Sequence, residues 1–269
     1  MKKALLAILL VLAMAAGFAA CGKEDTQPVE PIELPVGAAE ILQLFNEATA
    51  KAVSLRPGYS KTRYTKITEL NFGALGALGG LGSQSAVMET VYAFLGVESS
   101  GEGTVAYTVK KGERSGLLRA SEWTMADIKS ASAEPDGKGG YTVTISVRGG
   151  ATRWGGGGGD DPGSGTAKSA VDNGPFCYGE DDSPDYDHKT ALNLYYTVNH
   201  TEGASTEDIG ETVTGAQITA KIDSRGRLTE LTGRLDMRID VYHVQYSIIT
   251  LRGNSGEGYS EVTYSDFKY

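Results

Sequence analysis

The length, composition and charge of the chain already narrow its class. It has 269 residues, with 25 basic and 34 acidic side chains, three His and two Cys. A chain of this length buries enough surface to fold without cross-links, and two Cys exclude a disulfide framework or a Cys-rich zinc module. The net charge of −9 argues against a nucleic-acid partner, because binding to phosphates needs a basic face.

The first 21 residues have the pattern of a secretory signal. Lys2 and Lys3 supply a positive start, and the run from Ala4 to Ala20 has neither a charged nor a polar side chain. Small residues precede Cys21, as they do before a cleavage site. The run is short for a membrane span, which needs about 20 residues. We therefore expect residues 1–20 to be a signal peptide.

The residues Phe18-Ala19-Ala20-Cys21 resemble the lipobox of bacterial lipoproteins, although that family prefers Leu, Val or Ile where this chain has Phe18. In that family the Cys thiol receives a diacylglycerol, the signal is cut before it, and the Cys becomes the first residue. The resemblance implies lipidation of Cys21 and an anchor on the extracytoplasmic face of the bacterial cell membrane, where two or more acyl chains hold firmly. A plain secretory peptide and an uncleaved anchor are the alternatives.

Residues 21–37 are expected to be the lipidated cysteine and a tether. Three prolines stiffen this stretch, and its acidic side chains keep it solvated. The signal peptide holds two Lys and no acids, which leaves 23 basic and 34 acidic groups, a net charge of −11. A surface potential of that sign is expected to hold the domain off anionic lipid. Cys177 then has no partner cysteine, and a bystander in a loop is favoured over a nucleophile.

Two amphipathic helices are predicted early in the mature domain. Apolar residues recur at three- and four-residue steps over 38–55, which predicts a helix that stops at Pro57-Gly58. A strand is expected from Tyr64 to Leu70. The Gly- and Leu-rich stretch after it is either a flexible loop or a flap over a cavity. The second helix is expected over 85–95.

From residue 103 the period changes to two, which is typical of strands with one buried and one wet face. Strands are predicted before Pro135 and over 105–109, 141–147, 192–198 and 218–222, with a hairpin turn at 223–226. The Gly-rich and acidic stretch 149–189 is expected to be a loop excursion, with 149–165 the most mobile stretch outside the tether. A turn is expected at Asn254–Gly258, before a last strand that ends at Tyr269.

The clearest predicted strand covers residues 231–241, and its phase flips after Val241, which indicates a bulge or a bend. Arg234 and Arg238 are expected in water. The residues expected to face the helices are Leu231, Leu235, Met237, Ile239 and Val241. The helix residues expected to meet that face incompletely are Ile41, Phe45, Val87 and Val91. An incomplete contact would leave an apolar pocket suited to an acyl chain.

These elements predict an α+β fold, in which a curved antiparallel β-sheet (half-barrel) packs on a few N-terminal helices in a single domain, 38–269. The element order and long late strands resemble the lipoprotein-carrier half-barrel (the LolA/LppX-like fold). The phrases RPGYSKTRYTKI and ITAKIDSRGRLTEL resemble uncharacterised lipoproteins of Gram-positive bacteria. The carrier resemblance implies acyl chains held between sheet and helices.

The sequence contains no complete catalytic or metal-binding motif. Ser265 and Lys268 have Ser-x-x-Lys spacing, but they lie in a strand pattern. The acidic run 180–187 departs from a calcium loop, which needs Gly at its sixth position and Glu at its twelfth. Trp154, beside five Gly, is expected half buried at a strand end, with a contact for glycan, peptide or membrane as the alternative. The histidines lack metal-ligand spacing: His188, His200 and His243.

We therefore expect a non-catalytic, membrane-anchored lipoprotein without cofactor, metal or catalytic residue. Its partners are expected to be the membrane, through the lipid anchor, and an apolar small molecule or lipid between sheet and helices. The alternative is a cell-envelope interaction or scaffold module that binds an envelope protein through the outer sheet face and 149–189. A hydrolase is the third hypothesis, and nothing in the motifs supports it.

Overall fold

The computed structural model describes residues 35–71, 98, 100–155, 173–176, 204–246 and 249–269. Within these ranges it describes the backbone alone for 152–155, 204–208 and 243–252. The expected signal peptide and lipidation site, most of the tether, the second helix and the strand over 192–198 lie outside the described residues.

The first predicted helix is confirmed as α2, Ala38–Leu55. Its buried stripe includes Ile41, Phe45 and Ala48, which follow the three- and four-residue spacing of the sequence. The helix ends where Arg56 adopts a left-handed conformation with φ 48° and donates its backbone N–H to the carbonyl of Ala52. This left-handed cap turns the chain into the first strand.

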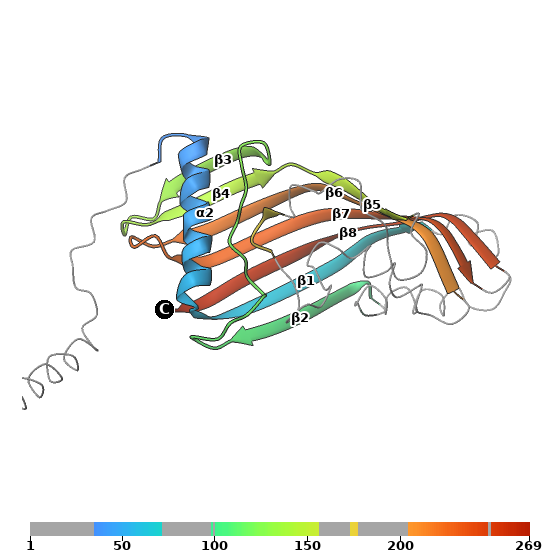
Figure 1. Cartoon of the computed structure of the whole chain (residues 1–269), viewed down its shortest axis with the longest axis horizontal. Coiled ribbons are helices and arrows are strands. Elements are labelled where there is room, and N and C mark those ends of the chain that lie inside the picture. Colours follow the sequence, from blue (N-terminus) through green and yellow to red (C-terminus); the bar gives the residue numbers. More distant parts are fainter. Residues whose placement is uncertain (1–34, 72–97, 99, 156–172, 177–203, 247–248) are drawn as a thin grey trace, which may run out of the picture. The chain divides into compact units, whose positions relative to one another are not determined.

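One curved, unclosed antiparallel sheet of eight strands makes up most of the described structure, so the α+β class holds with one described helix (Figure 1). The strands are β1 Gly58–Asn71, β2 Glu102–Val109, β3 Ile128–Pro135, β4 Tyr141–Val147, β5 Gly150–Gly155, β6 Ala204–Ile222, β7 Leu228–Tyr246 and β8 Ile249–Lys268. Their order is β2-β1-β8-β7-β6-β4-β3, with β5 also paired to β6. The first strand therefore pairs with the last.

The expected turn at Asn254–Gly258 is wrong, because these residues lie inside β8. Gly256 pairs with Ile239 and Gly258 with Met237 on the neighbouring strand. Glycine is required at Gly258 because the neighbouring backbone leaves no room for a side chain, not because the chain turns there. A Cβ on Gly258 would lie 2.4 Å from the backbone carbonyl oxygen of Lys66. Glycine inside a strand often marks such a close approach of two backbones.

The expected loop excursion 149–189 is wrong at 150–155, and its other described part, 173–176, is irregular as expected but packs into the protein. Gly150–Gly155 forms β5 and pairs with β6, because an open strand edge satisfies the backbone N–H and C=O groups of even a Gly-rich segment. Phe176 is 1% exposed and belongs to the hydrophobic core. Its ring lies on the bare backbone of Gly233, where an added Cβ would be 2.3 Å from the ring.

The predicted register of β7 is confirmed at its centre. Leu231 and Leu235 are fully buried, Met237 is buried, and Arg234 is exposed. Ile239, Val241 and Arg238 are only half-buried. The expected bulge after Val241 is present as well, because β6 pairs with Val241 and His243 but passes over Tyr242. α2 crosses only one end of the sheet (Figure 1).

The pocket expected between the first helix and this strand is not present beside the residues that the structure describes. Phe45, Leu231 and Leu235 each have 0% exposure, so not even a water-sized probe fits beside them. Trp123 contributes to the filling, since its ring stacks on Phe45 with centroids 5.5 Å apart. Side chains therefore occupy the space under α2. The other two helix residues expected there, Val87 and Val91, lie outside the described residues.

Candidate functional site

Most residues singled out in the sequence lie outside the described part of the chain. They are Cys21, Cys177, His188, His200 and the acidic run 180–187. Only the backbone is described for Trp154, which pairs with Ile209, and for His243, which pairs with Asp208. Lipidation of Cys21 therefore remains a prediction.

The Ser-x-x-Lys spacing falls in strand β8, as the sequence pattern predicted. Ser265 Oγ donates a hydrogen bond to Asp266 Oδ2 at 3.2 Å, and Lys268 is exposed. Residues three apart share a face in a helix but not in a strand, and Asp266 between these two has φ 57°. The arrangement therefore lacks the helical-turn spacing that brings such a Ser and Lys together.

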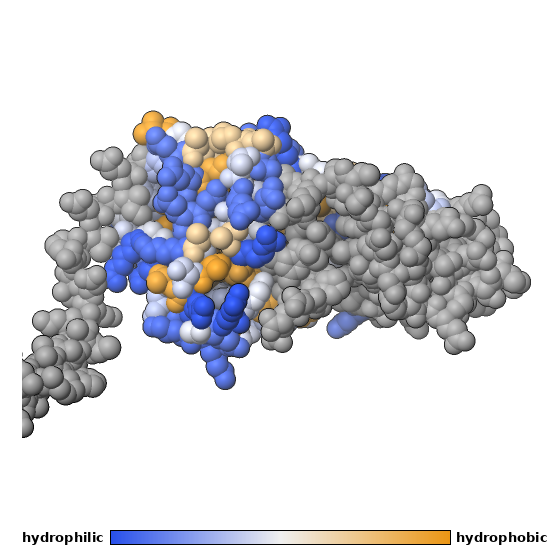
Figure 2. Space-filling view, viewed as in Figure 1, coloured by the Kyte–Doolittle hydropathy of each residue, from blue (hydrophilic) through white to orange (hydrophobic). Residues whose placement is uncertain are grey.

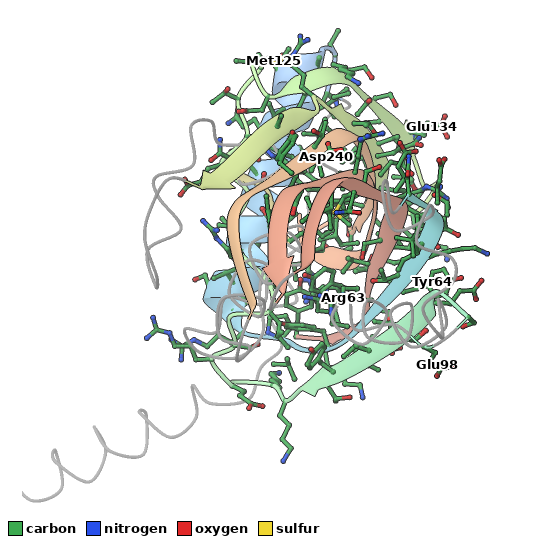
Figure 3. The ribbon with its side chains drawn as sticks, turned by 90° about the vertical axis from the view of Figure 1, so that its right-hand side faces the viewer. Arg63, Tyr64, Glu98, Met125, Glu134 and Asp240 are labelled. Atoms are coloured by element: carbon green, nitrogen blue, oxygen red, sulfur yellow. The ribbon has the colours of Figure 1, made fainter. Side chains whose placement is uncertain are left out.

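The most organised polar chemistry of the described residues lies on the outer face of the sheet, opposite α2. Alternation along β7 turns every second residue outward, and β8 lays a matching row beside it. The cross-strand pairs are Arg234 with Glu261, Asp236 with Tyr259, and Arg238 with Glu257. Figure 3 shows the same division on β1, where Arg63 lies inside the curve of the sheet and Tyr64 outside it.

Arg238 joins carboxylates from two strands. It contacts Glu257 across the strands at 2.8 Å and Asp240 along its own strand at 2.9 Å. The hydrogen bond to Asp240, followed by that to Glu257, raises the pKa of Arg238 above its ordinary value, so the guanidinium stays charged. Its side chain is 43% exposed, and ion pairs in such positions contribute at most about 1 kcal/mol to stability.

Arg234, four residues before Arg238 on the same face of β7, repeats the arrangement and adds an aromatic contact. It contacts Asp236 at 3.1 Å and Glu261 at 3.2 Å. Its guanidinium carbon lies 3.8 Å from the ring centroid of Tyr259, a distance at which the ring quadrupole attracts a cation. Tyr64 lies next in the row, with its ring 6.1 Å from that of Tyr259.

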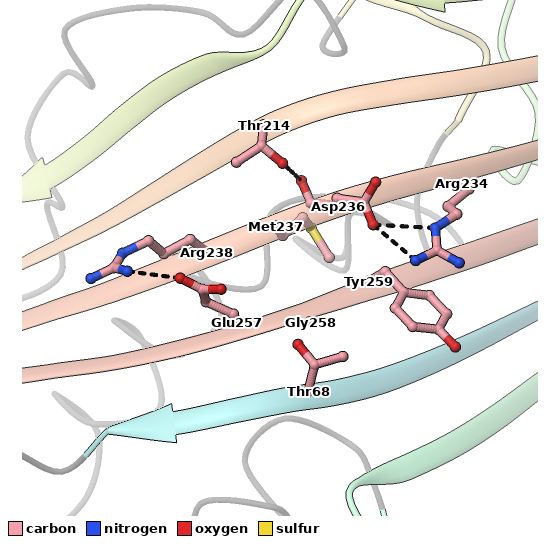
Figure 4. Close-up of a pocket in the computed structure, with 9 residues that line it drawn as sticks. All are labelled: Thr68, Thr214, Arg234, Asp236, Met237, Arg238, Glu257, Gly258 and Tyr259. Atoms are coloured by element: carbon pink, nitrogen blue, oxygen red, sulfur yellow. Dashed lines mark hydrogen bonds and ion pairs between the residues drawn. The ribbon is translucent and has the colours of Figure 1, made fainter.

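Two β-bulges open a hollow between these pairs. The register shifts at Thr68 in β1 and at Thr214 in β6. Both shifts fall at the level where Met237 pairs with Gly258, so the bulges line up across the sheet. The hollow has a volume of about 250 Å³ and is lined by residues of β1, β6, β7 and β8 (Figure 4). Figure 4 shows its polar side chains with no described helix over them.

The hollow presents hydrogen-bond donors and acceptors side by side. Among the residues that line it, the two arginines are matched by Asp236 and Glu257, so the lining is balanced in charge and offers its remaining N–H groups and carboxylate lone pairs. In the described ranges, no group of three or more His, Cys, Asp and Glu residues could hold a metal ion. The arrangement can therefore bind a polar molecule through hydrogen bonds and ring contact.

Lys61 is a second unusual charged residue, on the inner face of β1. Its side chain is 1% exposed, and Nζ lies 5.4 Å above the ring of Tyr264 and 6.0 Å above that of Tyr107. Tyr264 in turn donates its hydroxyl proton to the carbonyl of Leu117 at 2.6 Å. Two aromatic rings thus flank the buried ammonium.

The sequence predicted the arginines of this site as solvent-facing residues but missed its other parts. Glu257 was missed because it lies in the Asn254–Gly258 stretch, which has the composition of a turn, and Tyr259 directly follows that stretch. Thr68 and Thr214 enter the hollow through bulges, which depend on register across the sheet. The spacing of Arg234, Asp236 and Arg238 at every second position was the one available signal.

The described helix of the chain is not long and apolar enough to cross a membrane. In comparisons with known proteins, the chain matches no protein-family model, no curated protein and no solved structure.

Proposed function

We propose that this chain is a bacterial lipoprotein, anchored by acyl groups on Cys21 to the extracytoplasmic face of the membrane. The support comes from the sequence: a positive start, an apolar run and the residues Phe18-Ala19-Ala20-Cys21. The Pro-rich stretch that follows suits a spacer between a membrane and a folded domain.

We propose further that the mature domain is a cell-envelope binding module that holds its ligand without transforming it. The observation that carries this proposal is the outer-face hollow, with Arg234, Arg238, Glu257 and Tyr259 around it. Surface ion pairs of this kind add little stability. Their gathering around one hollow is better explained by recognition than by folding.

The chemistry of the hollow favours a neutral, hydroxyl-rich ligand, such as one sugar unit of an envelope glycan. A hydroxyl group accepts from an arginine N–H and donates to a neighbouring carboxylate, and Thr68 and Thr214 add hydroxyls of their own. An anion would meet the four carboxylates that flank the two arginines, whereas an apolar ligand would leave these groups desolvated.

Glycan binding is tested with the full-length protein on an array of neutral envelope glycans. Arg238→Gln should abolish binding, because it removes donors to the hollow and leaves the Asp240 and Glu257 carboxylates unpaired. Lys221→Gln is the matched control, since Lys221 forms a 2.9 Å pair with Glu230 outside the hollow. Equal binding by both variants would contradict the site, and specific capture of an envelope protein without any glycan would favour a scaffold module.

The anchor is tested separately. Cys21→Ala should release the protein from membranes, and the mass of the amino-terminal peptide of the unchanged protein should include acyl chains. Membrane retention of the Cys21→Ala variant would contradict the lipoprotein proposal.

An apolar ligand held inside the curve of the sheet is the second candidate, as the carrier-like half-barrel implies. The half-buried state of Ile239 and Val241 favours it. Because the space under α2 is filled, such a ligand would have to lie beyond the helix. Native mass spectrometry with lipid extraction from the source organism tests this candidate, and recovery of a stoichiometric lipid would place it first.

A further inference from the structure

One end of the sheet gathers a surface made of turns, which we name the turn end. The β3–β4 turn, the β6–β7 turn, the chain after β2, the end of α2 and the C-terminus all lie there (Figure 1). Contacts join these segments: Gly112 donates its N–H to the Arg56 carbonyl at 2.8 Å, and Lys51 Nζ donates to the Arg225 carbonyl at 2.6 Å. The turn end is therefore one continuous surface.

The turn end carries exposed cations that are not neutralised by partners. Six of them form no ion pair with another described residue: Arg56, Lys110, Lys111, Lys138, Arg225 and Lys268. This differs from the outer face, where Arg234 and Arg238 each contact two carboxylates. The side chains of the turn end are thus free to reach a partner.

The nearby carboxylates are mostly engaged with the backbone of the same turns. Asp136 accepts the N–H of Lys138 at 2.7 Å, Asp223 accepts that of Arg225 at 2.9 Å, and Glu113 accepts that of Lys110 at 3.0 Å. These bonds hold the carboxylates close to the chain, while the longer cationic side chains extend past them. Glu134 and Asp266 add negative charge at this end, but Lys51 and Arg227 also lie there, so the cations named here still outnumber the carboxylates.

Two exposed apolar side chains accompany the cations. Val53 is 41% exposed and Leu55 is 49% exposed, and they stand at the end of α2 directly before Arg56. Figure 2 shows apolar residues next to hydrophilic ones toward this end of the helix. Cations beside a few exposed apolar groups are typical of surfaces that bind at a membrane interface.

We propose that the turn end docks on the anionic phospholipid headgroups of the membrane that holds the Cys21 anchor. This inference rests on the proposed anchor, because residues 22–37 span at most about 55 Å and so keep the domain within reach of the bilayer. It also revises the expectation drawn from net charge. Salt at 0.1 M screens electrostatic attraction over about 10 Å. The cations that lie close to the membrane therefore determine whether the domain binds it, and the net charge of −9 for the whole chain does not.

The test uses the full mature chain with Cys21→Ser, so that no acyl group contributes to binding. It is mixed at low ionic strength with vesicles of phosphatidylcholine alone, or of phosphatidylcholine with phosphatidylglycerol. We expect sedimentation with the anionic vesicles only, and release at high salt. The triple variant Lys111→Gln, Lys138→Gln, Arg225→Gln should bind the anionic vesicles at least about tenfold more weakly, since each cation near an anionic surface adds to the attraction.

The matched control removes the same charge elsewhere: Lys66→Gln, Lys129→Gln, Arg148→Gln. It should bind like the unchanged mature chain. Equal weakening in both triple variants, equal binding to neutral vesicles, or no binding at low salt would each overturn the proposal. None of these outcomes bears on acylation, which the mass of the amino-terminal peptide reports independently, so failure of the docking surface and failure of the anchor are distinguishable.

Discussion

The two faces of β7 are held in place by different forces, although their residues alternate along one strand. The inner face places Leu231 and Leu235 at 0% exposure against the core. The outer face places Arg234 and Arg238 in ion pairs that remain more than two-fifths exposed. Burial stabilises the first set by about 1.5–3 kcal/mol for each large apolar side chain, whereas the second set contributes little. The outer residues are therefore free to serve recognition, and changes on the two faces should have different consequences.

The largest expected effect comes from a cavity on the inner face. Leu235→Ala should lower the free energy of unfolding by about 2–5 kcal/mol, because the neighbours of a fully buried Leu cannot collapse completely into the space left. Urea denaturation followed by circular dichroism measures it. Gln217→Ala, on the exposed face of β6, is the control. A loss below about 1 kcal/mol for Leu235→Ala would show that this interior is not close-packed.

A smaller loss is expected when an atom is added to the same face. Gly233→Ala would put a Cβ 2.3 Å from Phe176 Cζ, and displacing the ring should cost about 1–3 kcal/mol. Combining it with Phe176→Leu should recover part of the loss, because the smaller side chain makes room. If the losses of unfolding free energy from the two single variants simply add in the double variant, the contact between the Phe176 ring and Gly233 is contradicted.

A pH-dependent loss is expected at the buried end of β1. Burial raises the pKa of the Tyr59 hydroxyl above its ordinary value, so the unfolded chain releases this proton at a lower pH than the folded protein does. The stability tied to Tyr59 is then complete below about pH 10 and is lost as the pH rises through the higher folded pKa. Urea midpoints measured from pH 9 to 11 should fall more steeply for the unchanged protein than for Tyr59→Phe.

The smallest expected effect comes from the outer face. Arg238→Gln should lower the free energy of unfolding by less than about 1 kcal/mol, and added salt should shrink the difference further. A loss as large as that of Leu235→Ala would erase the contrast between the faces and give the ion pairs a structural role.

Local pattern predicted the helix and the register of β7, because 3.6- and two-residue periods report directly which side chains are buried. The pattern was misleading at Gly256 and Gly258, where glycine serves close approach between strands and not a turn. It could not pair Arg238 with Glu257, since that contact depends on which strands are neighbours. The hollow was harder still to predict, because it forms only where two bulges, in strands far apart in the sequence, lie at the same level of the sheet.

The pairing of β1 with β8 has a consequence for how the chain is made. Thr65 and Ser260 lie across from each other although 195 residues separate them in sequence, and β8 occupies a central place between β1 and β7. Contacts between such distant segments form slowly, because the intervening chain must be ordered at the same time. The sheet cannot be completed during synthesis until β8 has been made. A chain cut short before residue 249 would expose two long strand edges to aggregation.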